Sequence, residues 1–101
     1  MSRSLPKPKR VVDLHAETFL DNWEDYQADE LLRESIDHLR EQLDAAIYWE
    51  YPEIHFIHGR GRGVLRDVVY SELRSYQADG LVAHFHPSYC NPDVVIVILA
   101  L

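Results

Sequence analysis

The chain has 101 residues, of which 47% are hydrophobic, and its formal net charge is −7. This length predicts a single domain, and this hydrophobic content excludes an intrinsically disordered chain. No apolar run reaches the roughly 18 residues of a membrane span, and the N-terminus lacks the apolar core of a secretion signal. The single cysteine, Cys90, cannot form a disulfide within the chain. We therefore expect a cytoplasmic domain without a membrane partner.

The charges are unevenly distributed along the chain. Residues 1–10 carry four cations and no acid, and residues 11–59 carry 13 acids and two arginines, a balance of −11. Residues 60–101 carry four of each sign, and three of those arginines fall within residues 60–66. A phosphate-bearing ligand would be attracted to this basic cluster and repelled by the acidic background. The pattern predicts a local, salt-sensitive phosphate contact and argues against a generic nucleic-acid coat protein.

The first half of the chain predicts a linker, a strand and a long helix. Residues 1–10 combine prolines with basic residues, which indicates a flexible basic linker ahead of a domain at 11–101. Residues 11–15 begin with β-branched side chains and predict a strand. Residues 16–27 are acidic and predict a loop with room for one helical turn. From residue 28 to about 49 the apolar residues follow a 3.6-residue period, which predicts an amphipathic helix that Pro52 ends.

The second half predicts three strands and another helix. Residues 53–58 predict a strand, residues 59–63 a glycine-rich turn, and residues 64–76 a second amphipathic helix. Residues 81–86 and 93–101 predict two more strands, and the nearly continuous apolar character of the last one indicates a central position. The resulting order is β-α-β-α-β-β. Such alternation implies parallel pairing of the first strands, with the helices packed on the sheet.

The glycine-rich turn is a candidate anion site. Glycine permits positive φ and a close approach of the backbone to a ligand. The turn also leads into a helix, whose first amides attract anions. The turn lacks the Gly-Lys-Ser/Thr ending of a Walker A loop. The alternative is that the segment only connects a strand to a helix, and that its glycines serve the tight turn and not a ligand. The candidate phosphate-binding residues are Gly59, Arg60, Gly61, Arg62, Gly63 and Arg66.

Asp13, His15 and His58 are the candidate catalytic residues. The carboxyl ends of parallel strands gather ligands, and the first two predicted strands end at these residues. Asp13 and His15 are two positions apart and so share one face of a strand. A carboxylate can orient an imidazole as a general base, and a second imidazole can protonate a leaving oxygen. The same three residues could bind a divalent metal, or could make only capping and structural hydrogen bonds. His38, on the charged helix, is expected to face solvent.

Two motifs together resemble the Smr (small MutS-related) domain family. They are Val-Asp-Leu-His at 12–15 and Ile-His-Gly-Arg-Gly-Arg-Gly-Val-Leu-Arg at 57–66. The family pairs Asp-Leu-His-Gly with His-Gly-x-Gly-x-Gly, followed by Leu-Arg on the next helix. The resemblance extends over about residues 10–101. The long acidic segment and long helix look most like Smr domains at the end of larger bacterial proteins.

The resemblance implies a fold, a ligand and an activity. The fold is a two-layer α/β domain with a mixed four-stranded sheet, similar to the C-terminal domain of translation initiation factor three. The ligand is structured DNA or RNA, and several family members are endonucleases that nick DNA or cut RNA. Mg²⁺ and Mn²⁺ are the candidate cofactors, with no metal ligand assigned. Asp13 and His15 match the first motif, and His58, Gly59, Gly61, Gly63 and Arg66 match the second.

Two departures from the family pattern concern the cleavage of nucleic acid. Ala16 stands where the first motif has glycine, and residues 88–93 replace a late glycine-rich segment. Both weigh against nuclease activity more than against the fold. Two hypotheses for the function remain. The first is a nucleic-acid-binding domain that hydrolyses phosphodiesters. The other is a non-catalytic binding or protein-interaction module of a larger bacterial protein, in which the acidic 11–59 region docks a partner or another domain of the parent chain.

Overall fold

The computed structural model describes residues 5–59 and 63–100. The predicted order β-α-β-α-β-β is confirmed. The acidic segment 16–27, for which the sequence predicts a loop with room for one helical turn, contains two 3₁₀ turns. In chain order the elements are β1 (Val11–Asp13), η1 (Ala16–Thr18), η2 (Trp23–Asp25), α1 (Ala28–Tyr48), β2 (Glu53–Ile57), α2 (Val64–Ala78), β3 (Val82–Pro87) and β4 (Val94–Leu99).

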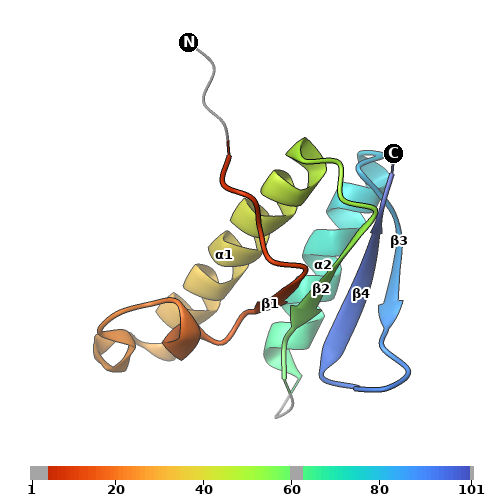
Figure 1. Ribbon diagram of the computed structural model, residues 1–101. Helices are drawn as coiled ribbons and strands as arrows, with labels where there is room; N and C mark the ends of the chain where they lie inside the picture. Colours follow the sequence, from red (N-terminus) through yellow and green to blue (C-terminus); the bar gives the residue numbers. More distant parts are fainter. Residues whose placement is uncertain (1–4, 60–62, 101) are drawn as a thin grey trace.

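The four strands form one mixed sheet in the order β1-β2-β4-β3. β1 pairs with β2 in parallel, while β4 is antiparallel to both β2 and β3. β4 is thus an inner strand, as its apolar sequence predicted. In the parallel pair Asp13 is the register partner of Ile57. The carboxyl ends of β1 and β2 therefore lie side by side at one edge of the sheet (Figure 1).

The hydrophobic core lies between the sheet and the two helices, which cover the same face of the sheet (Figure 1). Every second residue of the strands points into this layer, so Ile54 and Phe56 of β2 are fully buried. Their neighbours on the opposite face, such as His55 and Ile57, are partly exposed. The domain is a two-layer α/β fold. The helix residues of the core include Ile36, Leu39, Leu43, Val69 and Leu73.

His38 of α1 does not face solvent freely, as its charged surroundings had suggested. Its ring stacks on Phe19, with 4.0 Å between the ring centroids and 12° between the planes. Burial lowers the pKa of His38 below its ordinary value, and Glu41 opposes that shift. The sequence prediction was wrong because helical periodicity says nothing about a loop that folds back over the helix.

Residues 5–10 lie against the C-terminal end of α1 and the start of β2. The carbonyl oxygens of Leu5 and Pro8 each accept a hydrogen bond at 2.7 Å, from Trp49 Nε1 and Tyr51 Oη. The carbonyl of Arg10 accepts one from the His55 amide at 2.8 Å. Three main-chain positions of the predicted linker are thus hydrogen-bonded to the domain, and they lead the chain into β1.

Candidate functional site

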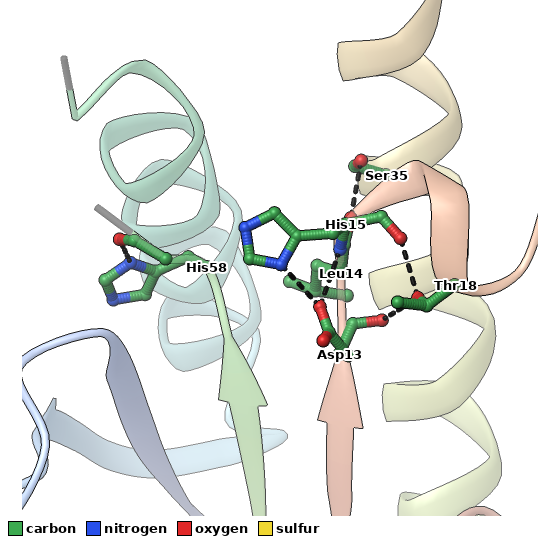
Figure 2. A network of polar contacts seen from close by, with 7 residues as sticks. Asp13, Leu14, His15, Thr18, Ser35 and His58 are labelled. Carbon is green, nitrogen blue, oxygen red and sulfur yellow. Dashed lines mark hydrogen bonds and ion pairs between the residues drawn. The ribbon is translucent and has the colours of Figure 1, made fainter. Parts of the chain in front are cut away.

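Asp13 and His15 form a hydrogen-bonded carboxylate–imidazole pair at the end of β1 (Figure 2). Asp13 Oδ1 lies 2.6 Å from His15 Nδ1 and also accepts the His15 amide hydrogen at 2.9 Å. The two side chains are 37% and 39% exposed, so solvent and ligand can reach them. An ionised carboxylate only accepts hydrogen bonds, so Nδ1 carries the proton and Nε2 of a neutral ring carries the lone pair. This geometry suits His15 to act as a base at Nε2.

The main chain around this pair is fixed on both sides of the buried Leu14. The Leu14 amide donates to the Ile57 carbonyl at 3.0 Å, and the Leu14 carbonyl accepts from Ser35 Oγ at 2.7 Å. Thr18 Oγ1 donates to the His15 carbonyl at 2.6 Å. Sequence reasoning missed Ser35 and Thr18. The available signal for Ser35 was a serine on the apolar face of α1, next to Ile36.

Replacing Ser35 with alanine is expected to lower the free energy of unfolding by about 1–3 kcal/mol, because it leaves the Leu14 carbonyl buried without its donor. Ser71→Ala on the exposed surface of α2 is the matched control and is expected to change stability by less than about 0.5 kcal/mol. Urea unfolding of both variants measures the difference. Equal stability of the two variants would show that the Ser35–Leu14 hydrogen bond contributes nothing.

Gly59 lies directly against the His15 ring. Its φ is +76°, and a Cβ atom built on it would overlap His15 Nε2 and lie 2.7 Å from Cε1. The amides of His58 and Gly59 both donate to the Asp93 carbonyl, at 2.9 and 3.1 Å. The lack of a side chain at Gly59 therefore allows the two motifs to pack closely. The Gly59 amide already donates its hydrogen bond within the protein, to Asp93. The segment 88–93 thus adjoins the second motif through Asp93.

His58 is placed differently from His15. The residue is 3% exposed, and its Nδ1 is 3.0 Å from the Gly59 carbonyl oxygen. The ring packs edge-on against Tyr70, whose pKa burial raises while Arg66 opposes the shift. Nε2 is buried without a hydrogen-bond partner among the described residues. Figure 2 shows the His58 ring turned away from the His15 ring, so the structure does not bring the two imidazoles together.

The start of α2 is the basic side of the site. Gly63 is the N-cap residue with φ of +78°, and no side chain caps the first turn. The Arg66 guanidinium lies over Gly63, since a Cβ there would be 2.8 Å from Nη2. Arg66 also pairs with Asp67 at 3.2 Å. Arg60, Gly61 and Arg62, the other predicted phosphate-binding residues, lie outside the described residues.

The described residues of the site do not provide a set of metal ligands. Within residues 5–59 and 63–100, no three His, Cys, Asp or Glu side chains are grouped so that they could hold a metal ion. Asp13 and His15 offer two ligands, and Asp13 Oδ1 is already hydrogen-bonded. The described residues do not fit Mg²⁺ or Mn²⁺, and we derive no step through a metal.

No helix in the described part of the chain is long and apolar enough to span a membrane.

Comparisons with known proteins show which family the chain belongs to. A family model of the Smr domain matches residues 29–99, which include the second motif and begin after Asp13 and His15. The crystal structure of the Smr domain of Thermus thermophilus MutS2 has a similar fold, with a TM-score of 0.67 and 22% sequence identity. That match covers 90% of this chain and 98% of the other. No curated protein sequence matches the chain. The family model covers well over half of the chain, which therefore belongs to the Smr domain family.

Proposed function

We propose that this domain binds DNA or RNA at the edge where β1, β2 and α2 meet, and that it hydrolyses a phosphodiester there. The observation that carries the proposal is the packing of the Asp13–His15 pair against Gly59, at the entry to the glycine-rich turn. A base is thereby held next to the start of a helix whose first turn has no side-chain cap. Helix starts attract phosphate, so the base and the phosphate site adjoin.

The phosphate is held on the basic side of His15. Arg66 lies over Gly63, and its guanidinium offers several donors to a phosphate oxygen. Arg60 and Arg62 add two charges by their position in the sequence. The remainder of the domain is acidic, with a balance of −11 over residues 11–59. Nucleic acid is thereby attracted to the turn and repelled elsewhere, which restricts contact to a few phosphates.

The hydrolytic step uses His15 as a general base. Nε2 removes a proton from a water molecule, and the Asp13 carboxylate stabilises the resulting imidazolium through Nδ1. The water oxygen forms a bond to phosphorus while the bond to the leaving oxygen breaks. His58 donates a proton to the leaving oxygen, which requires its buried ring to become accessible. The His15 imidazolium releases its proton to solvent, and His58 regains one from solvent.

Binding is expected to weaken steeply with salt and with loss of the arginines. Each phosphate contact removed by Arg60→Ala, Arg62→Ala or Arg66→Ala should reduce the slope of log K against log salt by about 0.7–0.9. Fluorescence anisotropy with labelled single-stranded and branched DNA and RNA measures this slope. Arg74→Ala, on the exposed surface of α2, is the matched control and should leave the slope unchanged. Equal slopes for all four variants would contradict the proposed contact surface.

A non-catalytic protein-interaction module is the second candidate. Trp23 in η2 is 39% exposed and is followed by the exposed acids Glu24 and Asp25. Partly exposed aromatic residues frequently anchor protein interfaces. If this candidate is right, Trp23→Ala reduces binding of a protein partner, and the arginine variants above leave it unchanged.

A further inference from the structure

An apolar cleft adjoins His15. It has a volume of about 500 Å³ and lies between η1 and the first turns of α1 and α2. Ala16, Leu31, Leu32 and Val64 contribute to its apolar lining, and His15 is part of its wall. Val64, the first residue of α2, is 54% exposed. Neither the binding of phosphate nor the hydrolytic step described above uses this cleft.

The residues around His15 and the cleft differ in charge. Arg66 lies over Gly63, at the N-terminal end of α2. The acidic residues Glu17 and Asp29 line the cleft, and none of the described residues that line it is Lys or Arg. A phosphate is attracted to Arg66 and repelled by the acidic lining. An uncharged group with apolar faces and N–H donors fits the cleft, because carboxylates accept hydrogen bonds from such donors.

A single nucleotide combines both properties. Its phosphate is anionic, and its base is a flat uncharged ring that buries apolar surface and presents polar edges. The volume of the cleft falls in the range of small-molecule sites and is too small for a duplex. A base enters such a site only when it is unpaired or turned out of its stack. His15 lines the cleft and packs against Gly59 through Nε2, so it joins the cleft to the glycine-rich turn.

We propose that the cleft receives one unpaired base of the bound nucleic acid, and that Glu17 and Asp29 accept hydrogen bonds from its exocyclic amino group. The proposal rests on the proposed nucleic-acid binding and extends it to the class of substrate. Cytosine, adenine and guanine carry such an amino group with two N–H donors, whereas thymine and uracil lack it and offer one ring N–H between two carbonyl oxygens that a carboxylate repels. The domain thus selects an unpaired, amino-bearing base beside the phosphate that it holds.

The test uses labelled duplex DNAs that differ only in one bulged nucleotide, which is cytosine, thymine or an abasic residue. Anisotropy measures their dissociation constants. Because burial or stacking of a base contributes to affinity, we expect the cytosine bulge to bind roughly tenfold more tightly than the abasic one, with thymine also weaker than cytosine. Equal affinities for all three DNAs would overturn the cleft as a base site.

Matched charge variants separate hydrogen bonding in the cleft from general electrostatics. Glu17→Gln/Asp29→Asn is expected to remove the difference between cytosine and thymine. Glu24→Gln/Asp25→Asn changes the net charge equally at exposed residues outside the cleft and should retain that difference. Retention of the difference in both double variants would contradict the role of the two carboxylates.

If the three DNAs bind equally while the arginine variants still weaken binding, the cleft proposal fails and nucleic-acid binding stands. Failure to bind any of the DNAs or RNAs overturns both proposals.

Discussion

Replacing His15 with alanine is expected to lower the rate of phosphodiester cleavage by about 10²–10⁴-fold, the usual contribution of a general base. The reason is the position of the ring, which is held by Asp13 at Nδ1 and has Nε2 beside the turn. Nucleic-acid affinity should change little, because the phosphate contacts come from the arginines. Single-turnover cleavage of labelled branched DNA or RNA, with affinity measured in parallel, checks both expectations.

The chain offers a matched control for this variant. His55 and Glu53 form a second carboxylate–imidazole pair with the same spacing, with 2.5 Å between Nε2 and Oε2, on the face of β2 away from the helices. His55→Ala removes an equivalent pair outside the proposed site and should leave the cleavage rate unchanged. Asp13→Asn should lower the rate, since the amide no longer stabilises the imidazolium. Undiminished cleavage in His15→Ala, or an equal loss in His55→Ala, would overturn the catalytic proposal.

Gly59→Ala is expected both to destabilise the fold and to stop cleavage. The positive φ of 76° costs a non-glycine residue about 1–3 kcal/mol. The new methyl group would also overlap the His15 ring, so that one of the two must move. The cleavage rate should therefore fall to the level of His15→Ala. Chemical denaturation and the same cleavage assay provide the two measurements.

Gly80→Ala distinguishes the backbone cost of a positive φ from the cost of the overlap with the His15 ring. Gly80 has an almost identical φ of +79°, yet a Cβ there would meet nothing within 4 Å. Its substitution carries the backbone cost alone, and the additional loss of stability in Gly59→Ala measures the overlap. The double variant His15→Ala/Gly59→Ala removes the overlapping ring and should recover that additional loss. Equal stabilities of Gly59→Ala and Gly80→Ala, with full cleavage activity, would refute the close packing of the two motifs.

The secondary structure could largely be predicted from local patterns in the sequence. The 3.6-residue period predicted α1, the crossover through α1 implied the parallel pairing of β1 and β2, and the apolar run at 93–101 indicated an inner strand. Contacts between distant segments could not be predicted in this way. The Phe19–His38 stack and the Ser35–Leu14 hydrogen bond join residues 19 and 21 positions apart, and tertiary packing alone determines them.

The candidate site was predicted in part. Strand alternation correctly grouped Asp13 with His15, and the shared sheet edge placed them near Gly59. The same alternation carries a signal for the orientation of the His58 side chain. Ile54, Phe56 and His58 occupy every second position, so the His58 ring continues the buried face of β2. The motif alone gives no direction for that ring, and it gives no indication of the cleft between η1 and the two helices.

The short pairing of β1 gives the domain two levels of stability. β1 is an edge strand of three residues with a single partner, and it contributes Val12 to the core, next to Leu14. The remaining three strands and both helices share the rest of the core. Detachment of β1 is therefore a local opening that requires less free energy than global unfolding. Such an opening removes His15 from Gly59 and leaves Arg66 in place, so cleavage is the more fragile property and affinity for phosphate the more durable one.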